Sequence, residues 1–479
     1  MSAIHDHAPV QLSDQAQQAI NANHDYLKSK LSEQDTTYYG INTGFGSLCQ
    51  VKIDHDNLQH LQYNLIVSHS SGTGPEVDDD IVRLMMLLKI QNLSIGYSGV
   101  RLSLVEHLIA LYNADILPII YEQGSLGASG DLAPLAHMGL TIIGQGQVRY
   151  QGQLMDATEA LTQAGLAAYV LGPKEGLALI NGTQFSTAYA TYCVYHAQRL
   201  ARTANLALAI SLDAFLGDRN PFDRKMHQLR SHQGQILVSD YILETLSDSQ
   251  LSSYDNEYVQ DPYSFRCAPQ VHGASMDTFA YAESVIHNEI NGVSDNPLLF
   301  ASTDQIISGG NFHAQPIALI LDFMAIALAE LGSISERRTY KLLSGERLLP
   351  PYLANNPGLE SGLMIAQYTA ASIVSQNKQL CTPASVDSII SSGGQEDHVS
   401  MAANAGTKCY QVVNNIYNVL SIELLAGIQA LECRRPSRSS TYIENIIKVY
   451  RKKVSRSLND EVLSVKIKDT NSFIRTIEF

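Results

Sequence analysis

A glycine-rich segment, Gly124 to His137, contains residues that could carry out chemistry on one another. It reads GSLGASGDLAPLAH, with glycines at positions 124, 127 and 130. Glycine adopts backbone angles that are closed to other residues, so this segment can bend tightly. Asp131 can cap a helix whose first turn holds Pro134, and the N-terminus of that helix would present partial positive charge to the loop.

Three interpretations of this loop follow from its residues. It could be a turn without chemistry. A phosphate-binding loop is disfavoured, because the Walker lysine and the G-x-G-x-x-G spacing are both missing. In a tightly bent loop, the Gly130 nitrogen could also attack the Ala128 carbonyl carbon and close a five-membered ring, since neither residue carries bulk near these atoms. Loss of water from Ser129 would then leave a methylidene group, which is a strong electrophile.

The same segment resembles the signature of the aromatic amino-acid ammonia-lyases, whose Ala-Ser-Gly forms 4-methylidene-imidazol-5-one (MIO). The match is specific because it covers many consecutive positions, and the resemblance runs from about Leu12 to about Glu432. It implies a carbon–nitrogen lyase that removes ammonia from an α-amino acid. Its electrophile would be an MIO made from Ala128, Ser129 and Gly130, a form of covalent catalysis that needs no external cofactor.

Such a lyase also needs a base for the substrate's β-proton and a clamp for its carboxylate. The resemblance places the base at Tyr39, in the loop YGINTGFG, although the side chain alone could equally be an aromatic plug. A phenolate base needs nearby positive charge or hydrogen bonds. Arg266 suits the clamp, because a guanidinium can make two parallel hydrogen bonds to a carboxylate; a structural ion pair is the alternative. Tyr263, one helical turn earlier, would face the same side, and the resemblance places it near the MIO.

Three further residues complete the expected substrate site. Gln260 and Asn181 are amides that suit the carboxylate, the MIO carbonyl or an ordered water, although most buried amides only pair with backbone. Phe312, in Gly-Gly-Asn-Phe-His, would form a wall of the pocket and could equally belong to the core.

Substrate choice depends on two positions. His69 lies in the segment NLIVSHSSG, which matches the family's side-chain-reading loop, but relatives that use tyrosine can also carry histidine there. Glu396, in GQEDHVSM, discriminates better, because a carboxylate can accept a hydrogen bond from an imidazole N–H. A phenyl ring offers no donor, and an unpaired buried carboxylate is costly. Glu396 therefore favours L-histidine as substrate and trans-urocanate as product, unless it is a salt-bridged surface acid beside Asp397 and His398.

The elements that must position these residues are mostly helices. Apolar periodicity predicts helices over residues 13–31, 56–68, 78–95, 100–113, 183–216, 275–291, 315–343, 365–380 and 402–431, and a small hairpin over 145–152. Helices this long and apolar indicate a buried bundle. We therefore expect a mainly α fold, a long-helix bundle of the fumarase/aspartase type by resemblance. Residues 1–110 would form a smaller region with the Tyr39 and His69 loops, and residues 111–479 would carry the MIO loop and the bundle.

Composition bears on partners and compartment. Charged residues make up only 16% of the chain, below the typical ~25%, which suggests a surface buried against other subunits. The resemblance implies a homotetramer with shared active sites; a surface-poor monomer is the alternative. A net charge of −15 argues against nucleic-acid binding. Six cysteines without C-x-x-C indicate free thiols in a reducing compartment.

No membrane or metal partner is expected. The N-terminus lacks the features of a signal peptide, and the most apolar run, residues 317–331, is too short and too charged to span a bilayer. The fifteen histidines include no H-E-x-x-H and no Cys/His cluster at ligand spacing. A cytoplasmic protein without a metal is therefore expected.

Two other functional classes stay open. The same site could serve tyrosine, or could belong to an aminomutase that returns ammonia to the β-carbon. The chain could also be a folded, non-catalytic relative, but the joint presence of Ser129, Tyr39 and Arg266 argues against this.

Overall fold

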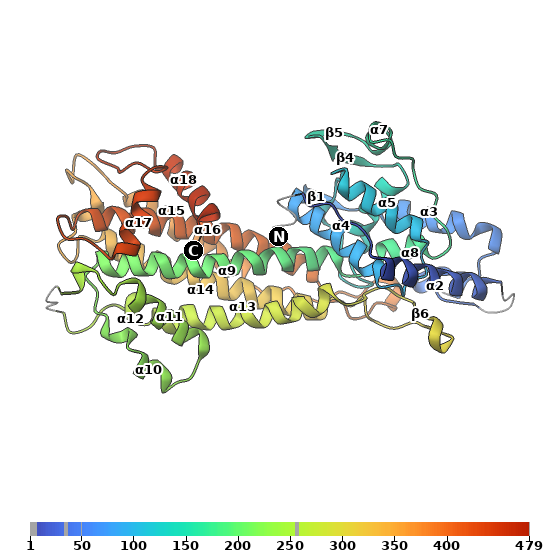
Figure 1. The fold of residues 1–479 in the computed structure, drawn as a ribbon, viewed down its shortest axis with the longest axis horizontal. Coiled ribbons are helices and arrows are strands. Elements are labelled where there is room, and N and C mark those ends of the chain that lie inside the picture. The colour runs from blue at the N-terminus through green and yellow to red at the C-terminus, as the bar shows by residue number, and fades with distance from the viewer. Residues whose placement is uncertain (1–6, 33–36, 49, 254–257, 479) are drawn as a thin grey trace. The chain divides into compact units, whose positions relative to one another are not determined.

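The computed structural model describes residues 7–32, 37–48, 50–253 and 258–478 (Figure 1). It is mainly α-helical, as the sequence predicts. By their internal contacts, the residues form two units. The first unit comprises Met1–Tyr192, Ser284–Asp322 and Pro383–Thr407, and the second comprises Cys193–Glu283, Phe323–Thr382 and Lys408–Phe479. The sequence predicts a division of the chain after residue 110, so that the Tyr39 and His69 loops fall in one part and the MIO loop in the other. This division stays a prediction.

The first unit contains short and medium helices with small sheets beside them. The helices are α2 (Asp14–Leu31), α3 (Leu58–His69), α4 (Asp79–Ser94), α5 (Leu102–Asn113), α6 (Leu132–Ile142), α7 (Ala157–Gln163) and α8 (Glu175–Ile180). Ser13 and Asp78 cap α2 and α4 by accepting a main-chain hydrogen bond, which satisfies N–H groups that helix starts leave unpaired. Helix α6 packs against both α3 and α8.

The strands of the first unit pair antiparallel. β1 (Thr73–Glu76) pairs with β3 (Tyr121–Gln123), and β6 (Leu298–Phe300) pairs with β7 (Gln305–Ile307). β4 (Gln147–Tyr150) lies between β2 (Leu117–Pro118) and β5 (Gln153–Asp156). The β4–β5 hairpin, with Tyr150 opposite Gln153, is the hairpin that alternation predicts over residues 145–152.

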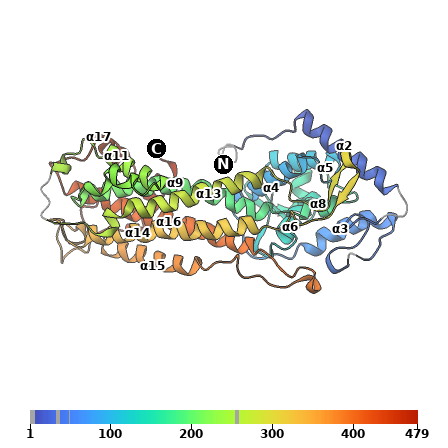
Figure 2. The ribbon, with the colours of Figure 1, turned by 90° about the horizontal axis from the view of Figure 1, so that it is seen from below.

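Long helices supply most of the second unit. Figure 2 shows α13 (Ala268–Ile290), α14 (Gln315–Leu343) and α16 (Ala402–Glu432) running alongside one another, and hydrogen bonds link α16 to α9 (Gln184–Ala214) and to α14. The other helices are α10 (Arg224–Gln228), α11 (Gln233–Thr245), α12 (Tyr263–Arg266), α15 (Met364–Leu380), α17 (Thr441–Tyr450) and α18 (Leu463–Thr476). The predicted long helices are confirmed, most within one or two residues at each end.

One prediction about this unit is wrong in detail. The helix expected from residue 275 starts at Ala268. Pro262 precedes the short helix α12, in which Tyr263 and Arg266 lie one helical turn apart as the sequence predicts. Proline has a backbone angle suited to a helix start, and this local effect is invisible to a search for apolar periodicity.

Helix α14 extends beyond the apolar run of residues 317–331 at both ends. By length and composition it is the one helix in the described residues that could cross a membrane. In its most apolar stretch, 67% of the residues are buried inside the protein, which is typical of a core helix.

No disulfide bond joins the cysteines in the described part of the chain, which are Cys193, Cys267, Cys381, Cys409 and Cys433. Cys49 lies outside the described residues.

A buried ion pair crosses the core of the second unit. Arg338 of α14 donates from Nε and a terminal nitrogen to the two carboxylate oxygens of Glu423 in α16, at 2.5 and 2.9 Å, and neither side chain is exposed. Another Arg338 nitrogen lies 3.3 Å from His272 Nε2, while His272 Nδ1 lies 2.8 Å from Asn205 Oδ1. Complete burial, with Arg338 adjacent, holds the pKa of His272 well below its ordinary value. His272 is therefore a neutral ring that donates to Asn205 and accepts from Arg338.

Replacing His272 with glutamine should weaken the dependence of stability on acid. An unfolded histidine takes up a proton below pH ~6.5, but folded His272 does not, because its pKa is lowered. Its stabilising contribution is complete above that pH and is lost as the pH falls, by up to ~1.4 kcal/mol per pH unit. Thermal midpoints of both proteins measured between about pH 7.5 and about pH 5 should converge as the pH falls. Parallel curves would contradict the assignment.

Candidate active site

A pocket of about 700 Å³ lies in the first unit and contains several of the predicted site residues. Every residue that lines it belongs to this unit. They are Tyr39, Gly44, Phe45, Gly46, Leu48, Val51, Ile53, Leu61, Asn64, Leu65, Ser68, His69, Ser129, Leu132, Leu177, Ile180, Asn181, Ser392 and Glu396. The structure thus brings together Tyr39, His69, Ser129, Asn181 and Glu396, which are far apart in the sequence.

Close main-chain contact fixes the loop that carries Ser129. Gly130 forms a parallel bridge to Gly182, and the Asp131 N–H donates to the Gly182 carbonyl at 2.7 Å. Gly130 has φ +79°, and a Cβ atom there would lie 2.1 Å from the Gly182 oxygen. Only glycine can occupy this position without displacing the main chain. The tight bend expected from the glycine spacing is therefore present.

Asp131 has a different role from the expected one. It occupies the N-cap position of α6, but its side chain makes no capping bond. Its buried carboxylate instead accepts from Ser125 Oγ at 2.8 Å, and from Ser186 N and Oγ at 2.9 Å each. Burial raises the pKa of this carboxyl, while the bonds from Ser186 and Ser125 lower it. Asp131 ties the Ser129 loop to the start of α9.

Glu396 hydrogen-bonds to the loop serine. Ser129 Oγ donates to Glu396 Oε1 at 2.9 Å, and Ser391 Oγ donates to Oε2 at 2.8 Å. Ser391 and Glu396 also exchange main-chain hydrogen bonds, which fixes the turn between them. Among the described residues no cation pairs with Glu396, so the structure does not support the salt-bridged surface acid that was the alternative.

His69 and Tyr39 contribute the imidazole and the phenol of the pocket. His69 ends α3, and its Nδ1 lies 3.0 Å from Ser68 Oγ. Burial lowers the pKa of His69, while a main-chain hydrogen bond and the charge of Glu396 oppose this shift. His69 is therefore mostly neutral near pH 7. The Tyr39 hydroxyl accepts a hydrogen bond from the Gly46 N–H at 3.3 Å, which holds the Tyr39 loop closed on itself.

Asn181 ends α8 and is almost fully buried. Its side-chain oxygen has no hydrogen-bond partner in the described part of the chain. Since Asn181 also lines the pocket, this oxygen can accept a hydrogen bond from a bound ligand.

Six predicted site residues do not line this pocket: Ala128 and Gly130, which flank Ser129 in its loop, and four others. Gln260, Tyr263 and Arg266 belong to the second unit. Tyr263 is 69% exposed, and the Arg266 guanidinium lies 4.4 Å from the centre of its ring, so the two side chains share one side as their spacing predicts. Arg266 Nε donates to the Asp261 carbonyl, and no carboxylate in the described residues pairs with Arg266. Phe312 belongs to the first unit and lies in the turn before α14.

Several residues that shape the pocket were not identified from the sequence. Leu177 and Ile180 face it from α8, and Ser391 orients Glu396. Lys89 bonds to the main chain of Asn181. A signal for Lys89 was present, because it is the only charged residue between Leu84 and Leu93 in the apolar middle of a helix. The other three have no such signal, because their importance depends on tertiary contacts.

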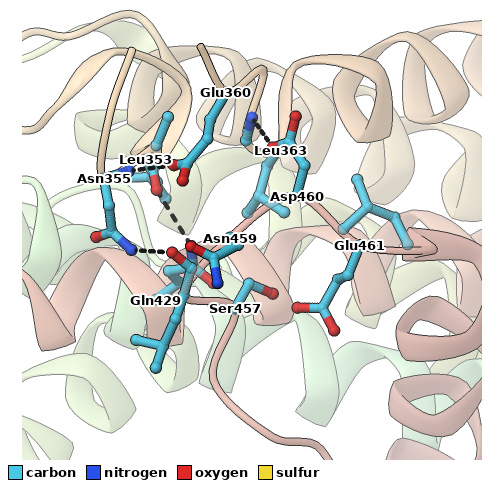
Figure 3. A pocket seen from close by; sticks show the side chains of 13 residues that line it. Leu353, Asn355, Glu360, Leu363, Gln429, Ser457, Asn459, Asp460 and Glu461 are labelled. Carbon is cyan, nitrogen blue, oxygen red and sulfur yellow. Dashed lines mark hydrogen bonds between the residues drawn. The ribbon is translucent and has the colours of Figure 1, made fainter.

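Figure 3 shows a second hollow, in the second unit, that is too small for a substrate. Its volume is about 10 Å³, room for about one water. Asp460 accepts from the N–H groups of Ser361 and Gly362 at 2.9 and 2.8 Å, and Glu360 accepts from those of Asn355 and Asn356. Asp460 thus joins two loops and Glu360 closes its own loop, so both carboxylates have a structural role.

The pocket and the mainly α fold place the chain in a known class of enzyme. It belongs to the aromatic amino acid lyase family, whose sequence model matches residues 1–452. The histidine ammonia-lyase of Desulfotalea psychrophila is 45% identical over 473 residues, which cover 98% of this chain and 92% of that protein.

Solved structures with the same fold have more than one activity. Histidine ammonia-lyase from Trypanosoma cruzi is similar with a TM-score of 0.91 and 37% identity, over 98% of this chain and 89% of that one. Phenylalanine aminomutase from Pantoea agglomerans is similar with a TM-score of 0.94 and 33% identity, over 98% and 95% of the two chains. Both have nearly the same backbone as this chain, so side chains must distinguish the activities.

The contact between Gly130 and Gly182 predicts a large effect of a single methyl group. Gly130→Ala should lower the free energy of unfolding by about 3 kcal/mol or more, because the Cβ would collide with main chain. Gly152→Ala is the matched control, since Gly152 also has positive φ (+74°) but nothing lies within 4 Å of its Cβ position. It should cost only about 1 kcal/mol. Equal shifts in denaturant midpoint would show that Gly130 has no special contact.

Proposed function

We propose that the chain acts as a histidine ammonia-lyase, which eliminates ammonia from L-histidine and leaves trans-urocanate. The observation that carries this proposal is the hydrogen bond between Ser129 and Glu396, in a pocket that also holds Tyr39 and His69. Relatives of that name, similar over nearly the whole chain, support it.

The residues fit the self-made MIO group. The loop Ala128-Ser129-Gly130 is bent at Gly127 and Gly130, both with positive φ, and it is pressed against Gly182 by a contact that admits no Cβ. Once formed, MIO would supply an electrophilic carbon for the substrate amine. No other group is needed for this chemistry.

The pocket residues would divide the remaining work. Glu396 would accept a hydrogen bond from the imidazole N–H of the substrate, and neutral His69 would contact the same ring. Asn181 would place its unpartnered oxygen against a polar group of the substrate or the MIO. Tyr39 would remove the β-proton, since it lines the pocket and its hydroxyl accepts a hydrogen bond from the Gly46 N–H.

A second copy of the chain would complete the site. We expect a homotetramer in which Arg266 of another subunit clamps the substrate carboxylate and Tyr263 and Gln260 lie beside it. The exposure of Tyr263, and an arginine with no carboxylate partner in the described residues, support this assignment. Phe312 as a pocket wall remains a prediction. We also expect a cytoplasmic enzyme.

The alternatives use the same fold. An aminomutase or a tyrosine ammonia-lyase would need the same electrophile, so Ser129 does not separate them. Glu396 does, because a phenol or phenyl ring would leave this carboxylate poorly matched. A non-catalytic relative would have no need for the Ser129, Tyr39 and Glu396 cluster in one pocket.

Activity on two amino acids tests the proposal. The purified protein should produce urocanate, followed by its near-ultraviolet absorbance, from L-histidine and no coumarate from L-tyrosine. Ser129→Ala should produce neither, because it cannot form the electrophile. Glu396→Gln should lower kcat/KM for histidine by about tenfold to about a hundredfold, the range expected for losing a hydrogen bond to a charged group. Activity on tyrosine alone would overturn the assigned substrate, and full activity of Ser129→Ala would overturn the electrophile.

Mixing two inactive variants tests the shared site. Ser129→Ala and Arg266→Ala chains should each be inactive alone, but assembled together they should regain activity. If each site takes Ser129 from one copy and Arg266 from another, random assembly gives about a quarter of intact sites. Coexpression with two different affinity tags isolates the mixed oligomers for assay. Mixed oligomers that stay inactive would place both residues on one chain or remove Arg266 from the site.

A further inference from the structure

Lys89, in α4, is a buried lysine that the proposed reaction does not use. Its side chain is inaccessible to solvent, and its Nζ donates to the carbonyls of Ala178 at 3.0 Å and Asn181 at 2.7 Å. No carboxylate in the described residues forms an ion pair with it. Burying an ammonium without such a partner costs more folding free energy than burying an apolar side chain. The value of Lys89 must therefore come from the main-chain carbonyls to which it donates.

Lys89 holds the end of a short helix. The last carbonyls of a helix lack partners within it, and a lysine can satisfy them. Asn181 is the residue at which α8 ends, and Gly182 follows with φ +124°. The Asn181 carbonyl is therefore bonded to Lys89, and the next carbonyl, that of Gly182, is bonded to the Asp131 N–H.

These two bonds fix the wall against which the Ser129 loop bends. Without Lys89, the Asn181 carbonyl would be buried and unpaired, and the Asn181-Gly182 peptides would be free to rotate. Gly182 would then no longer be held against Gly130, whose bend depends on that contact. We infer that Lys89 is a positioning residue for formation of the electrophile: it holds Asn181-Gly182 so that the Ala128–Gly130 loop is bent for ring closure.

The inference rests on the proposed function, because it concerns the step that makes MIO. In that step the Gly130 nitrogen bonds to the Ala128 carbonyl carbon. The Ala128 oxygen leaves as water with the hydrogens of the Ser129 and Gly130 nitrogens. A second water takes the Ser129 hydroxyl and its α-proton. Lys89 touches none of these atoms and acts only through the main chain of Asn181 and Gly182.

The surroundings of Lys89 indicate that its hydrogen bonds contribute more to holding Asn181-Gly182 than its charge does. Burial is the largest effect on the pKa of Lys89 and lowers it; Asp295 and Asp131 raise this pKa, Lys174 lowers it, and the net result is a pKa of about 7. Asp295 is already paired with Lys174 at 2.7 Å. Both the ammonium and the neutral amine carry N–H groups that can donate to the two carbonyls, so a neutral donor should replace part of the function.

The mass of one peptide tests the inference without any activity assay. Trypsin releases residues 102–149 intact, because no lysine or arginine lies between Arg101 and Arg149. Chains made in a short pulse and sampled over time should lose the mass of two waters from this peptide. In Lys89→Met the rate of loss should fall about tenfold, equivalent to ~1.4 kcal/mol in the barrier. Lys89→Gln, which keeps two N–H donors, should be intermediate.

Lys466→Met is the matched control. Lys466 is also a buried lysine that donates to a main-chain carbonyl, that of Ser455 at 2.6 Å; it differs in having an ion pair with Glu461 and in lying in the second unit. This variant should lower the thermal midpoint and leave the dehydration rate unchanged. If Lys466→Met slows dehydration as much as Lys89→Met does, general destabilisation explains the effect and the inference is overturned.

The remaining outcomes are also decisive. A wild-type rate in Lys89→Met overturns the role of Lys89 and leaves the proposed function intact. A wild-type peptide of full mass overturns the proposed function and the inference with it. If Lys89→Met yields no folded protein, Lys89→Gln decides: slower dehydration than wild type supports the inference, and an unchanged rate overturns it.

Discussion

The candidate site depends on two glycines, Gly130 and Gly182, whose main chains touch with no side chain between them. Because no side chain fits between two backbone segments this close, hydrogen bonds from neighbouring residues must hold them together. The Asp131 N–H supplies one such bond, and the buried Asp131 carboxylate extends the attachment to Ser186 at the start of α9. The position of Ser129 in the pocket follows from this contact.

Buried polar groups hold the other side of that contact. Helix α8 is only six residues long, too short to be stable alone. At its start, Glu175 accepts hydrogen bonds from Arg101, and Lys174 pairs with Asp295 where neither side chain is exposed. In its middle, the Leu177 N–H donates to Gln62. At its end, Lys89 donates to the carbonyls of Ala178 and Asn181. A short helix held in this way can present Leu177, Ile180 and Asn181 to the pocket as a rigid surface.

The sequence predicted elements well where the cause was local. Apolar periodicity located α14 at both ends, and Ser13 marked the start of α2. The glycine spacing predicted the bent loop, and side-chain chemistry together with the resemblance indicated five residues that do share the pocket. What it missed depends on partners distant in the chain: the carboxylate of Asp131 is bonded to Ser186, and not to its own helix, because α9 packs there. Similarly, no sequence pattern predicted that Arg266 would belong to the second unit.

The hydrogen bond between Ser129 and Glu396 has a consequence for timing. In the newly folded chain, the carboxylate proposed to read the substrate's ring is occupied by a hydroxyl of the protein itself. That hydroxyl is one of the groups lost when the electrophile forms. In an immature chain the electrophile would thus be absent and the Glu396 carboxylate would be occupied, and formation of the electrophile would correct both. Under the proposed function, the newly folded pocket is inhibited by its own serine, and it becomes able to bind substrate at the same time as it becomes able to react.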